Sequence, residues 1–283
     1  MKGEWKIILG ATLFALIPVG VSLEKNAGIF SLLFGRLFFA ALILLLISKN
    51  RNHLWKVWKS KSILIFWWSM TMLLAMVCYF FAIRLSGVSI SAAILGSQPV
   101  LIVLLGALLM REKISTTALL ASVMACIGIA LIAFDIPEGA KDLPMGIMMA
   151  LLSALFLSLN FVMKKKYLST IPTGQLLLLQ CLVQLPFLLP SFIMEIPIMN
   201  TQSFVIMAGL GLLCTVFAYS LIYTGIKTVS VQRIGILQSV EYVAPVIFGL
   251  IFFNEQISAY LIIAVVLILA ACAMASVPER KKA

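Results

Sequence analysis

Residues 106–115 read GALLMREKIS, and residues 249–258 read GLIFFNEQIS. Both stretches contain a glycine, five further residues, a glutamate, one residue and then Ile-Ser, and a further apolar run follows each of them. The shift of 143 positions between them also aligns Arg84 with Lys227 and Gln98 with Glu241. Apolar identities are common by chance, but a shared glycine and a shared Glu-x-Ile-Ser turn carry more weight. We therefore interpret the chain as two related units, residues 1–136 and 137–283.

The composition indicates that this chain lies in a membrane. Of its 283 residues 63% are apolar and 11% are charged, and its mean hydropathy is +1.15, whereas soluble domains carry roughly 25% charged residues. A helix that crosses the hydrocarbon needs about 20 apolar residues. The first run lacks the cleavage site of a signal peptide and counts as a span. The sequence predicts an all-α integral membrane protein with ten spans, near residues 5–23, 30–48, 63–84, 88–110, 115–134, 144–163, 173–194, 203–226, 230–253 and 257–277.

The charges indicate the orientation of these spans. The net charge is +11, but most basic residues lie in short gaps between apolar runs, which argues against nucleic acid as a partner. Of the 21 Lys and Arg residues, seventeen fall on one side of the ten spans and three on the other, and Arg36 lies inside a span. By the positive-inside rule both termini are cytoplasmic. We expect a multi-pass protein of the inner (plasma) membrane, with the lipid bilayer around it.

The repeat and the span count together predict a transporter. Each unit has five spans, an odd number, so the second unit enters the membrane from the opposite side. Inverted repeats of this kind are typical of transporters with a substrate site near the midplane and alternating access. The alternative is that duplication only built a stable bundle.

Several short motifs resemble one known family. They are Gly35-Arg36-Leu37-Phe38, Gln98-Pro99-Val100 followed by Gly106, and the two Glu-x-Ile-Ser turns. In this order and spacing the chain resembles an EamA-type member of the drug/metabolite transporter (DMT) superfamily over nearly its whole length. The resemblance implies ten helices in inverted halves, a central cavity, and small metabolites such as amino acids, nucleosides or amines as substrates, often exported. One departure is that Tyr242 stands where the family often has proline, and proline follows at Pro245.

Glu241 is the strongest candidate for a functional residue. An intramembrane charge is costly and needs a reason. Helical spacing places Gln238, Glu241, Tyr242 and Pro245 on one face of the ninth span. We expect Glu241 to line a cavity and bind a cationic group of the substrate or a proton used for coupling. The alternative is a structural pairing with a buried donor.

Arg36 is the opposite charge within the membrane. It lies about a third of the way into the second span from the outer side. Three interpretations remain open: an ion pair with Glu241, attraction of a substrate carboxylate, and extension of the side chain outward to the interface.

Other polar residues recur within the spans. Tyr219 and Tyr223 follow Thr215 at intervals of four residues, and Gln180 and Gln184 share the same interval. For isolated polar residues an interhelical hydrogen bond is the default explanation, and convergence on one cavity would indicate function. We count as further substrate-binding candidates Gln98, which precedes a helix-bending proline, Asn160, Tyr79, Tyr219, Tyr223 and Gln180.

The sequence offers no pattern for catalysis, metal binding or a cofactor. His53 is the one histidine, no His-Glu-x-x-His motif occurs, and no phosphate-binding glycine loop is present. We therefore predict no enzyme and transport driven by a gradient, most simply a secondary exporter of amino acids or related amphipathic metabolites. The alternatives are a membrane-embedded lipid-handling protein or enzyme and a non-transporting sensor. Spans five and ten contain almost no polar residues, and we expect them to be scaffold or a homodimer surface.

Overall fold

The computed structural model describes residues 2–47, 51–110, 141–168, 170–226, 240–253 and 258–275, together with 120, 123–124, 126–128 and 130–131. Every regular element in these ranges is helical. Three of the described helices begin with a side-chain cap: Asp142 accepts a hydrogen bond from the backbone N–H of Met145 (3.1 Å), Asn200 accepts one from that of Ser203 (2.9 Å), and the Ser258 hydroxyl accepts one from that of Leu261 (3.0 Å). Such caps satisfy backbone donors that the helix itself leaves unpaired.

The helices follow one another along the chain with short connections. In order they are α1 (Lys2–Leu23), α2 (Ile29–Ile47), α3 (Arg51–Ser86), α4 (Val88–Leu95), α5 (Gln98–Met110), α7 (Leu143–Tyr167), α8 (Thr173–Glu195), η1 (Ile196–Ile198), α9 (Thr201–Gly209), η2 (Leu210–Phe217), α10 (Ala218–Ile226), α12 (Val240–Phe253) and α13 (Ala259–Ala275).

The described helices are those of a multi-pass membrane protein. Seven stretches are long and apolar enough to cross a bilayer, and the helices 241–253 and 259–271 are apolar but shorter. The all-α prediction is confirmed for the part of the chain that the structure describes. Most of the predicted span 115–134, the first Glu-x-Ile-Ser turn and the second turn as far as residue 257 lie outside the described residues. Ten spans, the inverted repeat and the cytoplasmic termini stay predictions.

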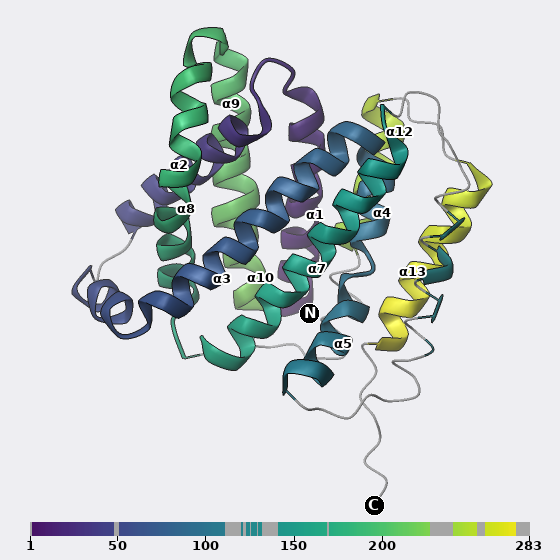
Figure 1. Cartoon of the computed structure of the whole chain (residues 1–283), viewed down its shortest axis with the longest axis horizontal. Coiled ribbons are helices and arrows are strands. Elements are labelled where there is room, and N and C mark those ends of the chain that lie inside the picture. Colours follow the sequence, from purple (N-terminus) through teal and green to yellow (C-terminus); the bar gives the residue numbers. More distant parts are fainter. Residues whose placement is uncertain are drawn as a thin grey trace, which may run out of the picture.

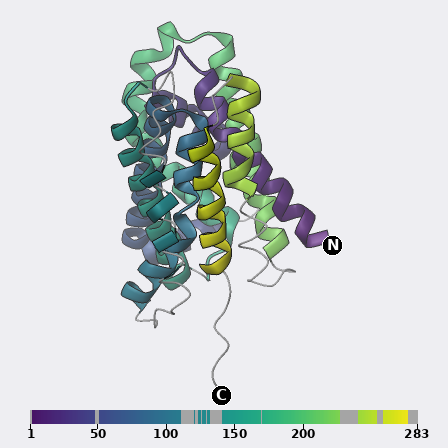
Figure 2. The same ribbon diagram turned by 90° about the vertical axis from the view of Figure 1, so that its right-hand side faces the viewer.

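The helices that pack together most extensively come from different parts of the chain. Helices α3 and α7 run side by side through its centre (Figure 1). Helix α2 lies between α8 on one side and the continuous segment α9–η2 on the other. Helix α1 packs along α10 and α12, and α13 lies against α4 and α5 (Figure 2). At Gly128 an added Cβ would meet the Ala264 carbonyl oxygen at 3.1 Å, so small residues bring the fifth and tenth predicted spans together.

Three predicted spans differ from single straight helices. Helix α3 begins at Arg51, before the predicted start at 63, and bends at Lys61 (φ −137°, ψ 24°). The fourth span is broken between α4 and α5, because Pro99 cannot donate the next helical hydrogen bond. The eighth span contains a π-helix, η2, between two α-helical segments. Breaks and π segments expose backbone groups and are frequent at functional sites.

Candidate functional site

A small cavity, lined by both polar and apolar side chains, lies among four spans of this apolar bundle. It has a volume of about 340 Å³, including its opening, and in this conformation the space between the side chains has room for about one water molecule. The lining comes from α2, α3, α8 and the segment η2–α10: Leu33, Arg36, Leu37, Met72, Leu73, Met76, Leu177, Gln180, Gln184, Thr215 and Tyr219. Three of the predicted substrate-binding residues, Arg36, Gln180 and Tyr219, therefore share one cavity.

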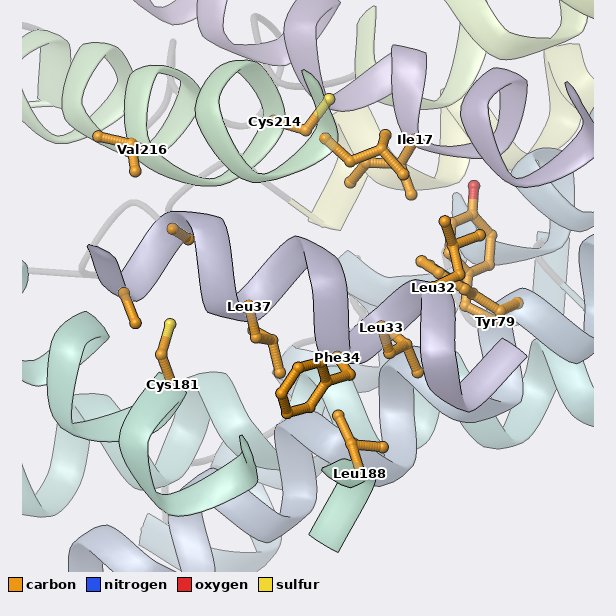
Figure 3. Close-up of a cluster of buried hydrophobic side chains, with 14 of the residues drawn as sticks. Ile17, Leu32, Leu33, Phe34, Leu37, Tyr79, Cys181, Leu188, Cys214 and Val216 are labelled. Carbon is orange, nitrogen blue, oxygen red and sulfur yellow. The ribbon is translucent and has the colours of Figure 1, made fainter. Parts of the chain in front are cut away.

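The Arg36 guanidinium is the charged group in the cavity lining. Its side chain is only 3% exposed, so it does not extend to the membrane surface. Its Nε donates a hydrogen bond to the Thr215 hydroxyl (2.9 Å), and its Nη1 lies 3.5 Å from the Met76 sulfur. Within the described ranges it forms no ion pair with Glu241. Figure 3 shows helix α2, which carries Leu33 and Leu37, passing between the helices of Cys181 and Cys214.

Glycines and the π-helix place Thr215 next to Arg36. The Thr215 hydroxyl donates to the carbonyl of Leu210, five residues back, as the wider π turn allows (3.2 Å). At Gly211 an added Cβ would lie 2.6 Å from the Arg36 carbonyl oxygen. A residue without a side chain is needed for this close approach. At Gly35 an added Cβ would meet the flexible Met207 side chain instead.

The remaining polar groups of the cavity are neutral. Gln184 donates from Nε2 to the backbone carbonyl of Ser69 (2.6 Å), which holds its amide at the wall. Gln180 lies one helical turn before it and is buried. The Tyr219 ring packs edge-on against Phe14 with 4.8 Å between ring centroids. Amides and hydroxyls of this kind both donate and accept hydrogen bonds.

A second group of predicted residues lies outside the cavity lining, where α12 approaches α3 and α5. The Tyr242 hydroxyl donates to Gln98 Oε1 (3.0 Å) and ties α12 to the start of α5. Tyr79 is buried and lies within range of an electrostatic interaction with the partly exposed Glu241. Figure 3 shows the Tyr79 ring beside Leu32. Tyr79 is one helical turn from Met76, so the two groups of residues are neighbours along α3.

Asn160 joins two helices and does not line the cavity. Its Nδ2 donates to the Trp68 carbonyl (2.7 Å) and the Thr71 hydroxyl (3.1 Å), and Trp68 Nε1 donates to the Asn160 carbonyl (3.1 Å). These bonds hold α7 against α3. This geometry corresponds to the default explanation for an isolated intramembrane polar residue.

We therefore expect Asn160→Ala to change stability and not binding. The loss of two interhelical hydrogen bonds should lower the free energy of unfolding by about 1 kcal/mol, measured by thermal unfolding in detergent. The dissociation constant of a substrate should stay within a factor of about two. A tenfold loss of affinity without a loss of stability would contradict this prediction and show that Asn160 belongs to the binding site.

Two predicted side chains are not among the described residues, and several residues of the cavity lining were not predicted. Gln238 and the side chain of Tyr223 lie outside the described residues. Met72 and Met76 line the cavity but carry no signal in an apolar helix. The sequence shows Thr215 and Gln184 among polar residues that recur every four positions, but only the fold places them beside Arg36.

A further polar cluster closes one end of the bundle. We call Glu24, Arg84, Glu195 and Ser203 the Glu24 cluster. Glu24 Oε1 accepts hydrogen bonds from the backbone N–H groups of Asn26 and Ala27 (both 2.8 Å) and from the Ser203 hydroxyl (3.0 Å). Arg84 Nη2 donates to the carbonyls of Glu24 (3.0 Å) and Ala27 (2.7 Å), and Glu195 accepts from the Gly28 N–H (2.6 Å). The cluster fixes the α1–α2 loop to α3, α8 and α9.

The EamA-like transporter family model matches the chain over residues 1–134 and again over residues 144–277. The chain belongs to this family. It is therefore a membrane transporter of the DMT type, and the resemblance inferred from the sequence motifs is confirmed.

Two similar proteins match nearly the full length of the chain. An uncharacterized transporter of Archaeoglobus fulgidus is 28% identical over 271 residues, which cover 95% of this chain and 94% of the relative. A solved crystal structure of another protein matches with a TM-score of 0.65 and 19% identity over 96% of both chains, a likeness that concerns the fold. Neither similarity identifies a substrate for this EamA-like transporter.

Proposed function

We propose that this chain is a secondary transporter of the inner (plasma) membrane that exports amino acids or related amphipathic metabolites by alternating access. The observation that carries the proposal is the cavity among α2, α3, α8 and η2–α10. It combines polar groups with an apolar wall of leucine and methionine in the interior of the bundle. An amphipathic metabolite has both kinds of surface, and ligand sites are usually apolar with a few placed polar groups.

Two irregular helical segments, a π-helix and a helix break, favour movement around this cavity. The π-helix η2 carries Thr215 in the cavity wall, and the α4–α5 break lies next to the Tyr242–Gln98 hydrogen bond. Discontinuous helices commonly form the substrate and coupling-ion sites of secondary transporters. Export is the direction expected from the family resemblance, and the transmembrane gradient supplies the driving force.

Glu241 is the proposed coupling residue. It lies in the first turn of α12, where Tyr242 connects this helix to α5. Its electrostatic interaction with Tyr79 reaches the face of α3 that continues to Met76 and the cavity. A change in the charge of Glu241 would therefore act on both the α4–α5 break and the helix that lines the cavity.

We expect Glu241→Gln to uncouple transport from protons. In proteoliposomes with a pH gradient, the wild-type protein should accumulate a labelled amino acid, whereas the variant should only equilibrate it, because glutamine does not titrate. The measurement is uptake from an amino-acid panel, with and without the gradient.

Glu4→Gln is the matched control, because Glu4 is a carboxylate in the first turn of α1 and does not line the cavity. Unchanged accumulation by Glu241→Gln would exclude Glu241 as the coupling site. Absence of flux for every compound in the panel would overturn the transport of amino acids itself.

A further inference from the structure

The charge of Arg36 has no countercharge in the described part of the molecule. The hydrogen-bond partners of its guanidinium there are the Thr215 hydroxyl and the Met76 thioether, both neutral. The thiols of Cys181 and Cys214 lie within electrostatic range of the guanidinium. A guanidinium has five N–H donors, so the recorded contacts leave donor capacity in a cavity-lining group.

Such an arrangement is unfavourable for an empty site. Burying a cation without an anionic partner carries a large desolvation cost, in proteins and especially in a membrane. A carboxylate that enters the cavity removes this imbalance, because charge-assisted hydrogen bonds to guanidinium are stronger than neutral ones. A second cation in the same cavity would add repulsion.

The other side chains of the cavity lining would surround that carboxylate. Leucine and methionine side chains from three helices form an apolar wall: Leu33, Leu37, Met72, Leu73, Met76 and Leu177. The other polar groups are the neutral side chains Gln180, Gln184, Thr215 and Tyr219. The described cavity wall contains no acidic side chain that would require a cationic amine on the ligand.

We propose that Arg36 binds the carboxylate of the substrate and that the substrate class is small carboxylates with an apolar chain. The carboxylate is required, and an α-amino group is accepted but not required. Cationic amines without a carboxylate bind more weakly because of the charge of Arg36. This inference rests on the proposed transport function, and it narrows the class of substrates to those that carry a carboxylate.

Three ligands of the same shape and different charge test the inference. They are L-leucine (zwitterion), 4-methylpentanoate (anion) and L-leucinamide (cation), added at equal concentration to the purified full-length protein. Thermal stabilisation by ligand reports binding through linkage. We expect leucine and 4-methylpentanoate to stabilise the protein and leucinamide to bind about 10- to 100-fold more weakly, the factor expected for one charge-assisted interaction.

Variants of Arg36 then separate the carboxylate site from a general effect. Arg36→Gln should weaken both carboxylates about 10- to 100-fold and leave the weak binding of leucinamide unchanged or improved. Arg36→Lys keeps the charge without the planar fork of donors and should retain part of the affinity. If Arg36→Gln does not fold, the ligand comparison on the wild-type protein and Arg36→Lys decides.

Two outcomes would overturn the inference. One is stabilisation by leucinamide equal to that by 4-methylpentanoate, and the other is no stabilisation by either carboxylate. Because binding is measured without flux, the result is independent of the uptake assay. Carboxylate binding without flux would contradict the proposed transport and leave the role of Arg36 intact.

Discussion

Replacing Gly211 with alanine should lower the free energy of unfolding by about 3 kcal/mol and weaken ligand binding in the cavity. The added Cβ would lie 2.6 Å from the Arg36 carbonyl oxygen and 3.0 Å from Phe39 Cβ. The first obstacle is backbone, which cannot rotate away as a side chain can. Helix α2 and η2 would have to separate by about 1 Å to reach an ordinary contact distance.

That separation acts directly on the site. The hydrogen bond from Arg36 Nε to Thr215 is 2.9 Å long and spans the same helix pair. A further ångström breaks a hydrogen bond of this geometry. We therefore expect the affinity for a bound carboxylate to fall together with the melting temperature, both measured on purified protein in detergent.

Gly209→Ala is the control for this prediction. Gly209 ends α9 directly before η2, has helical backbone angles, and has no atom within 4 Å of an added Cβ. Alanine there should be neutral or stabilise the helix by up to about 1 kcal/mol. Equal stability of Gly211→Ala and Gly209→Ala would contradict the close packing of α2 on η2.

Replacing Glu24 with alanine should be at least as damaging. The side chain is 2% exposed, and its Oε1 accepts three hydrogen bonds. Two of the donors, the Ala27 N–H and the Ser203 hydroxyl, are buried with it. A buried donor that loses its acceptor costs about 1–3 kcal/mol, so we expect a loss of about 3 kcal/mol or more.

Glu24→Gln separates the hydrogen bonds from the charge. Its side-chain carbonyl oxygen can accept the same three bonds in their weaker neutral form, and the electrostatic interaction with Arg84 is lost. We expect its melting temperature to lie between those of the wild-type protein and Glu24→Ala. If Glu24→Gln and Glu24→Ala unfold at the same temperature, the charge and not the hydrogen bonds holds the loop.

The structure places the two intramembrane charges, Arg36 and Glu241, in different surroundings. The sequence shows both as intramembrane charges, so each was a candidate for function on cost alone. The fold places Arg36 in the cavity wall and Glu241 near Tyr79 on a neighbouring surface of α3. Helical spacing within one span cannot show this, because it does not state which other span each face meets.

Asn160 and Gln180 illustrate the same point for neutral residues. Both stand in apolar spans and had equal standing as candidates. In the structure Asn160 donates hydrogen bonds to residues of α3, while Gln180 lines the cavity. The difference arises from the rotation of α7 and α8 about their own axes, which is determined by packing against neighbours.

The amino-acid sequence alone determined that this protein lies in a lipid bilayer, that its fold is all-α, and which family it belongs to. The bilayer requires long apolar helices, and the hydropathy of the sequence shows them directly. The motifs around Gly35, Gln98 and the two Glu-x-Ile-Ser turns indicate the family. Only the tertiary structure decided which polar side chains meet. The position of Arg36 beside Thr215 depends on a π turn and a close contact at Gly211, since distances between helices arise from packing and not from local sequence.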